Sequence, residues 1–260
     1  MAKFVIIGTY RVGSTLLKDV FGKHCLNEIF GHDYYINMNP KLSVVRGKRP
    51  LDYLEYHLNK PGLDIMGAKV MIDQLPGPAL IKILKAPKYK KILLIRENLT
   101  DMAVSYVFMC VAKQTILFDK ELYKEGLEKI PYAHGLMGTS RNMPKPFKVK
   151  IPELKKRCED TFRRMHNCQK ILEAQKAEYL KLTYNDLLLP SGELNLAVIN
   201  TARKFVDLSE YDSYKSPLKK MANEEIYRKC IKNYDEINRV LGQRYGVLFS
   251  NKRPAIWEGE

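Results

Sequence analysis

Residues 3–23 read KFVIIGTYRVGSTLLKDVFGK and contain the change of pattern that decides the fold. Residues 3–7 form a short apolar run, which is typical of a buried strand, and Gly8 ends it. From Ser14 to Lys23 the apolar residues recur at helical spacing. The chain therefore opens as a strand, a glycine-containing turn and a helix.

The same alternation continues along the chain. Further strands are predicted at residues 67–72, 91–95 and 179–183, and long helices at 151–178 and 223–241, with Gly242 just past the last one. Asn98, Thr100 or Asp101 can cap a helix that continues through Val107, and Asn185-Asp186 can begin another. Strands that alternate with helices predict an α/β fold of three layers, with a mostly parallel sheet flanked by helices.

The length of 260 residues fits one large α/β domain, and we expect a single domain over residues 1–260. The segment 118–150 differs from the rest because it is rich in Lys, Gly and Pro and has weak periodicity. We interpret it as a lid or an inserted substrate loop.

The chain is strongly basic, with 44 Lys and Arg against 29 Asp and Glu and a net charge of +15. Such a charge attracts nucleic acid, an acidic membrane, or a phosphorylated or sulfated small molecule. No run approaches the roughly 18 apolar residues of a membrane helix. The five cysteines are odd in number and form no CxxC pair, which disfavours a zinc cluster or a disulfide framework. The first residues lack the long apolar stretch and the small-residue cleavage site of a signal peptide, so a reducing cytoplasm is the expected location.

The first turn, Gly8 to Thr15, resembles the phosphate-binding pattern G-x-x-x-x-G-K-[ST] in its two glycines and its final Thr. Ser14 stands where that pattern has Lys. Glycines let the backbone approach an anion, and amides at a helix N-terminus point toward it. The lysine that reaches the β and γ phosphates in ATP and GTP hydrolysis is missing, so a shorter anion suits this loop better.

Arg11-Val12-Gly13-Ser14-Thr15 resembles the 5′-phosphosulfate loop of sulfotransferases, which use 3′-phosphoadenosine 5′-phosphosulfate (PAPS) and have a P-loop-like fold. The RxGST form is most similar to the carbohydrate and bacterial-type members. The resemblance implies that these five residues bind PAPS.

A second segment, residues 91–107 (KILLIRENLTDMAVSYV), resembles the strand, loop and helix that hold the 3′-phosphate in this family. The resemblance assigns that role to Arg96 and Ser105. Because Glu97 aligns with the arginine of the cytosolic enzymes, Arg96 is expected to serve from the neighbouring position. An arginine and a hydroxyl together suit a terminal phosphate.

Weaker resemblances extend the match over about residues 4–245 in the family's order. Residues 67–70 with Gln74 resemble the GxK strand of the carbohydrate-type enzymes, which implies substrate binding by Lys69 and Gln74. Residues 182–187 (LTYNDL) resemble the YEDL element, and residues 233–236 (NYDE) resemble a C-terminal region of the same group.

Sulfuryl transfer needs a general base for the acceptor hydroxyl and cations for the departing phosphate, and it needs no metal. Glu28 resembles the glutamate base of the carbohydrate-type enzymes, and His32 is the second candidate. Arg11 is the candidate for contact with the transferring group.

The sequence therefore predicts a PAPS-dependent sulfotransferase that acts on a hydroxyl acceptor, with a carbohydrate or a glycolipid favoured. Two alternatives stay open. One is a P-loop kinase of a small molecule, which the missing lysine disfavours. The other is a basic nucleic-acid-binding protein. The chain has no RNA-binding or helix-turn-helix signature, so no specific nucleic-acid partner is expected.

Overall fold

A computed structural model of the chain describes residues 3–30, 50–61, 64–118, 145–189, 191–215 and 224–258. The chain divides into two compact units. The first consists of residues 1–96 and 161–217, and the second of residues 97–160 and 218–260. The chain thus leaves the first unit after residue 96 and returns to it at residue 161.

The first unit contains a five-stranded sheet, which confirms the predicted α/β class. Its strands are β1 (Lys3–Gly8), β2 (Cys25–Leu26), β3 (Gly67–Met71), β4 (Tyr89–Ile95) and β5 (Tyr179–Thr183). The strand order is β2-β3-β1-β4-β5, and every pairing is parallel. The chain first moves from β1 to one side of the sheet and later to the other, so β1 lies at the point where the direction of winding reverses.

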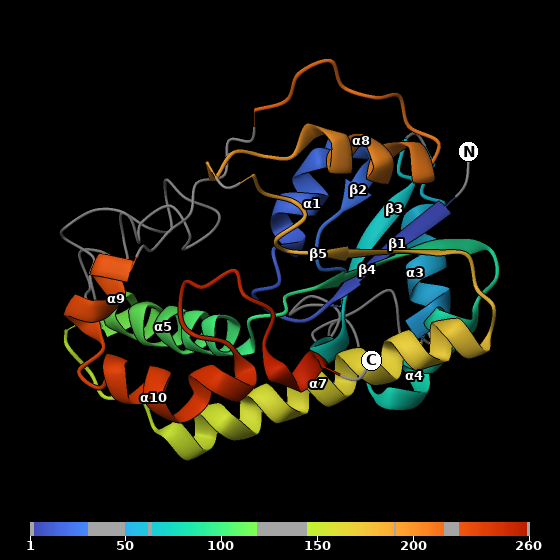
Figure 1. The fold of residues 1–260 in the computed structure, drawn as a ribbon. Coiled ribbons are helices and arrows are strands. Elements are labelled where there is room, and N and C mark those ends of the chain that lie inside the picture. Colours follow the sequence, from blue (N-terminus) through green and yellow to red (C-terminus); the bar gives the residue numbers. More distant parts are fainter. Residues whose placement is uncertain are drawn as a thin grey trace. The chain divides into compact units, whose positions relative to one another are not determined.

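Helices cover both faces of this sheet (Figure 1). On one face lie α1 (Ser14–Val20) and α8 (Leu196–Phe205), which contact each other. On the other face lie α3 (Pro50–Leu58), α4 (Gly77–Lys85) and the part of α7 (Ile151–Ala174) that belongs to the first unit. Two short 3-10 turns, η1 (Gly22–His24) and η2 (Ile72–Gln74), complete the described elements of this unit. The result is the predicted three-layer arrangement.

The strand register places two buried lysines on opposite faces of the sheet. Lys69 of β3 is the partner of Ile6, and Lys91 of β4 is the partner of Val5, the preceding residue of β1. Because successive side chains of a strand point to opposite faces, Lys69 faces α1 and Lys91 faces α4. The Lys91 ammonium donates to the Ala86 carbonyl just after α4 at 2.6 Å, and so satisfies the end of that helix.

The described part of the second unit is mostly helical. It contains α5 (Leu99–Phe118), the first ten residues of α7, α9 (Glu224–Cys230), α10 (Tyr234–Tyr245) and the short turn η5 (Ala255–Trp257). Of the three predicted caps for α5, Asn98 is the one used, because its side-chain oxygen accepts the Asp101 amide at 2.9 Å. The buried Trp257 donates its indole N–H to the Glu97 carbonyl at 2.9 Å, which ties the C-terminal turn to the residue before this cap.

Two predicted helices differ in the structure. The residues after β5 form a turn in which Thr183 and Asp186 exchange hydrogen bonds, and the next helix begins only at Leu196. The helix predicted over 223–241 is two helices, α9 and α10. Gly242 lies inside α10, and Gly246, with a φ of 108°, is the residue past its end.

Two further findings concern the described residues as a whole. None of their helices is both long enough and apolar enough to cross a membrane. All five cysteines are free thiols.

Candidate functional site

Five segments of the first unit form the candidate site, and all of them lie at the same edge of the sheet. They follow the carboxyl ends of the five parallel strands: the loop of residues 8–15 follows β1, and single residues follow the other four. These residues are Glu28 after β2, Gln74 after β3, Arg96 after β4 and Tyr184 after β5. In open parallel sheets, ligands bind at this edge and at the strand where the winding reverses, which here is β1.

The loop after β1 has an unusual backbone. Arg11 has a φ of 68° and Gly13 a φ of 87°, so both lie in the left-handed region. For a residue with a side chain this conformation costs energy, and it persists only where the surroundings hold it. Here the Arg96 guanidinium donates from Nη1 to the Arg11 carbonyl at 3.0 Å. Arg96 therefore holds the strained residue of the loop from the neighbouring strand.

Tyr184 covers the same part of the loop. The Arg96 guanidinium carbon lies 4.6 Å from the centre of the Tyr184 ring, a cation–π contact. A Cβ atom on Gly13 would lie 2.5 Å from this ring, so only glycine allows the ring to approach so closely. The Tyr184 amide donates to the Ile95 carbonyl at 2.7 Å, which fixes the backbone of Tyr184 beside Arg96. The aromatic ring, the guanidinium and the glycine thus pack as one stack.

The hydroxyl residues at the start of α1 face β3. Ser14 is buried, and its hydroxyl donates to the Met71 sulfur at 3.7 Å. Thr15 is exposed, and its hydroxyl accepts a hydrogen bond from the Lys69 ammonium at 3.1 Å. A cation thus reaches the loop from β3, although the loop lacks the lysine of the common phosphate-binding pattern.

The Lys69 ammonium also forms an ion pair with the predicted base. Its Nζ lies 2.8 Å from Glu28 Oε1. The Lys69 side chain is 1% exposed, whereas that of Glu28 is 32% exposed. The carboxylate is therefore open to a substrate on one side and bound to a buried cation on the other. Desolvation lowers the pKa of Lys69 from its ordinary value, and the neighbouring Glu28 carboxylate opposes this shift.

The second oxygen of the Glu28 carboxylate is held by Gln74. The Gln74 Nε2 donates to Glu28 Oε2 at 2.9 Å and lies 3.2 Å from the Tyr10 hydroxyl. The Tyr10 amide donates to Asp73 Oδ2 at 3.3 Å, so two consecutive residues after β3 touch one loop residue. Polar contacts therefore run without a break from Tyr10 through Gln74, Glu28 and Lys69 to the loop hydroxyl of Thr15.

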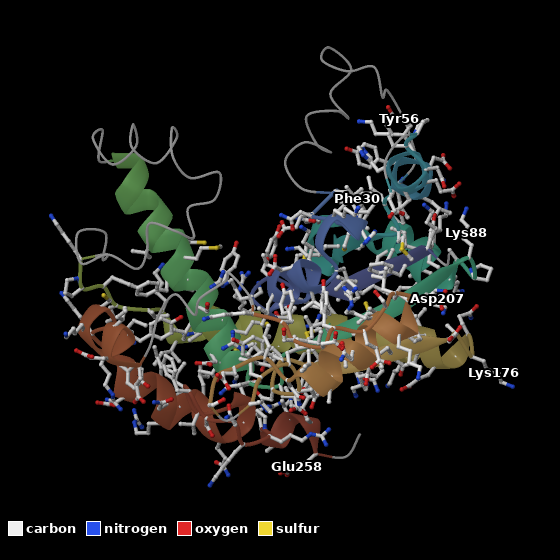
Figure 2. The ribbon with its side chains drawn as sticks, turned by 90° about the horizontal axis from the view of Figure 1, so that it is seen from above. Phe30, Tyr56, Lys88, Lys176, Asp207 and Glu258 are labelled. Atoms are coloured by element: carbon white, nitrogen blue, oxygen red, sulfur yellow. The ribbon has the colours of Figure 1, made fainter. Side chains whose placement is uncertain are left out.

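Glu28 owes its place to the short strand β2 and to an aromatic anchor. β2 pairs with β3 from Cys25 to Leu26, which sets the direction of the chain that follows. Two residues beyond Glu28, the buried ring of Phe30 lies 5.9 Å from that of Tyr53 on α3. Phe30 is labelled in Figure 2. The carboxylate is thus held between a sheet edge and a packed aromatic pair.

The structure brings most of the predicted site residues together. Glu28 contacts both Lys69 and Gln74, and Lys69 also contacts Thr15. Arg96 contacts the loop at Arg11. Val12 is fully buried, so its contribution to the loop is packing together with its backbone. The Arg11 side chain is half-buried at the same loop.

For other residues the predicted assignment stays a prediction. Ser105 is buried on α5 in the second unit, so its pairing with Arg96 around a 3′-phosphate stays a prediction. His32 and most of the segment 118–150 lie outside the described residues.

Tyr184 and Tyr10 were not among the predicted site residues. Tyr184 directly follows a predicted strand, and Tyr10 lies within the predicted loop. Their positions at strand ends were the available signal.

Comparison with known proteins adds no family to this description. No protein-family model matches the chain, and no curated protein matches it. The function therefore has to be argued from the residues of the site.

Proposed function

We propose that the protein is a PAPS-dependent sulfotransferase that transfers a sulfuryl group to a hydroxyl acceptor, with a carbohydrate or a glycolipid as the favoured acceptor. The observation that carries the proposal is the contact of Lys69 with both Glu28 and Thr15. It joins a carboxylate that suits a general base to a loop that suits an anion, through one buried cation. The reducing cytoplasm expected from the sequence is part of the same proposal.

The reaction follows from this arrangement. The 5′-phosphosulfate would lie at the loop of residues 11–15, with Arg11 and Lys69 as the nearby cations. The acceptor oxygen forms a bond to sulfur while the bond between sulfur and the bridging phosphate oxygen breaks, and the electron pair leaves with the phosphate. Glu28 takes the acceptor proton. Cations near the departing oxygen stabilise the charge that develops there.

Several observations favour this chemistry over the alternatives. Ser14 replaces the loop lysine on which nucleoside triphosphate hydrolysis relies, and β4 is followed by Arg96 where a kinase of this kind would have a metal-binding aspartate. The net charge of +15 is accounted for in part by a multiply charged nucleotide. The nucleic-acid alternative predicts that the protein stays bound to DNA at moderate salt. Non-specific binding to DNA is lost at moderate salt, and such a loss would count against this alternative.

The proposal is tested by thermal-shift titration with adenosine 3′,5′-bisphosphate, the product nucleotide, beside a titration with ATP and magnesium. A ligand that binds only the folded state raises the melting temperature. At a ligand concentration of a hundred times the dissociation constant, it adds about 2.7 kcal/mol to the free energy of unfolding. We expect stabilisation by the bisphosphate and none by ATP. Stabilisation by ATP alone would favour the kinase, and no response to either would reject nucleotide binding.

The matched variants for this titration are Arg11→Ala in the loop and Arg163→Ala on the exposed surface of α7. Both remove one arginine from the first unit. We expect only Arg11→Ala to weaken binding of the bisphosphate, because only Arg11 belongs to the loop. Equal affinities of the two variants for the bisphosphate would show that Arg11 does not take part in binding it.

A further inference from the structure

The Lys69 ammonium lies at the junction of the two halves of the site. It donates to Thr15 Oγ1 at the loop and pairs with Glu28 Oε1 at the base, and its side chain is 1% exposed. A buried ammonium needs partners for its charge, because the cost of removing it from water is several kcal/mol. Any anion that reaches the loop therefore competes with Glu28 for this cation.

Both oxygens of the Glu28 carboxylate are engaged in the structure. Oε1 is bound to Lys69 at 2.8 Å and Oε2 to Gln74 at 2.9 Å. An acceptor hydroxyl needs one of these oxygens within hydrogen-bond distance before its proton can move. Gln74 is a neutral amide and attracts an incoming anion less than the Lys69 ammonium does. The carboxylate oxygen held by Lys69 is therefore the one that an incoming anion can release.

We propose that Lys69 is a positioning residue that couples the two substrates: the anionic donor at the loop draws the ammonium away from Glu28 Oε1, and the acceptor hydroxyl then takes its place. This inference rests on the proposed function and adds an order to it, with the donor binding before the acceptor. The proton balance is unchanged. The acceptor proton goes to Glu28, and the ammonium stays protonated beside the departing phosphate.

Calorimetric binding of adenosine 3′,5′-bisphosphate tests the coupling without knowledge of the acceptor. Glu28→Gln keeps the shape of the side chain and releases the cation to the ligand, so the bisphosphate should bind about three- to tenfold more tightly. The double variant Lys69→Met/Glu28→Gln removes both charges together and leaves no lone buried ion. It should bind the bisphosphate about tenfold or more weakly than the wild type, because the charge-assisted hydrogen bond is lost.

Two control variants separate the coupling from general effects. Lys91→Met removes a second buried strand lysine, 2% exposed, from the opposite face of the same sheet, and should leave bisphosphate affinity unchanged. Asp73→Asn removes a carboxylate charge beside the loop residue Tyr10 without touching Lys69, and should tighten binding less than Glu28→Gln does.

The outcomes distinguish the coupling from the proposed function. If the wild type does not bind the bisphosphate, the proposed function fails. If the wild type binds but Glu28→Gln is no tighter than Asp73→Asn, the anion binds beside an intact ion pair and the coupling is wrong. A double variant that binds as tightly as the wild type also overturns it. Once an acceptor is found, initial-rate kinetics of the wild type should give the ordered pattern, and a random order of binding would overturn the coupling.

Discussion

Gly13 allows the loop of residues 8–15 to lie directly against an aromatic ring. Its φ of 87° is one that a residue with a side chain rarely adopts, and the Tyr184 ring occupies the space where a Cβ would be. The same ring carries the Arg96 guanidinium that holds the Arg11 carbonyl. A methyl group at position 13 would therefore disturb the backbone and its support together.

Gly13→Ala should lower the free energy of unfolding by about 2–4 kcal/mol, of which about 1–2 kcal/mol is the left-handed backbone conformation. It should also weaken binding of adenosine 3′,5′-bisphosphate at least tenfold, since the loop must shift. Urea unfolding and calorimetry measure the two effects. The matched control is Gly192→Ala, which has a φ of 84° but no neighbouring atom within 4 Å. Equal losses of stability in both variants would show that the ring contact contributes nothing.

For single residues, the sequence predicted which side chains lie together better than it predicted the contacts that they make. Glu28, Lys69 and Gln74 could be selected because their order along the chain resembles that of a known family. In the structure, Glu28 lies within hydrogen-bond distance of both other residues. The stacking of Tyr184 on Arg96 was not predictable. It depends on the adjacency of β4 and β5, whose sequence positions lie far apart.

Among the elements, the break between α9 and α10 has a specific cause. The strand-like residue Phe147 exchanges hydrogen bonds with the chain on both sides of Ile231, at 2.8 and 2.9 Å. Two residues later, the Asn233 side chain bonds both backbone groups of Val149, each at 2.9 Å. These backbone groups take the place of further helical hydrogen bonds, so a helix pattern of normal periodicity is interrupted by tertiary contacts.

Asn233→Ala should cost the second unit about 2–4 kcal/mol, because it leaves two buried backbone groups of Val149 without partners. Hydrogen exchange should show the loss at the Val149 amide, whose exchange should quicken by roughly thirtyfold or more. Asn251→Ala, on the exposed surface of the same unit, serves as the control. Unchanged protection of the Val149 amide in Asn233→Ala would contradict this explanation of the break.

The strands were the most predictable elements because their patterns are local. The apolar runs at 91–95 and 179–183 lie within β4 and β5, and the predicted 67–72 overlaps β3. The errors in the predicted helices fall where other partners replace helical hydrogen bonds, as in the turn from Thr183 to Asp186 and at Phe147 beside Ile231. Such replacements depend on partners distant in the sequence or on local turns that compete with helix.

At the scale of the whole molecule, buried thiols make stability depend on pH in the alkaline range. Burial raises the pKa of Cys25, Cys158 and Cys168 from 9.0 to about 12 each. A group whose pKa is raised by folding stabilises the protein fully below its unfolded pKa, and this stability is lost as the pH rises toward the folded value.

The urea midpoint should therefore be nearly constant from pH 7 to 8.5 and should fall above pH 9. Each of these thiols contributes up to about 1.4 kcal/mol per pH unit in that window. Cys168→Ala should give a shallower decline than the wild type when both are compared with their own midpoints at pH 7. A midpoint that stays constant up to pH 11 would be incompatible with burial of these thiols.

The two units are interleaved along the chain, and this order affects synthesis on the ribosome. Strands β1 to β4 are complete at residue 95, but β5, which pairs with β4, begins only at Tyr179. At roughly 5–20 residues per second, the free edge of β4 waits about 10 s for its partner. An unpaired strand edge invites pairing with other chains. A nascent chain of this protein therefore carries an open sheet edge for several seconds while the first segment of the second unit is translated.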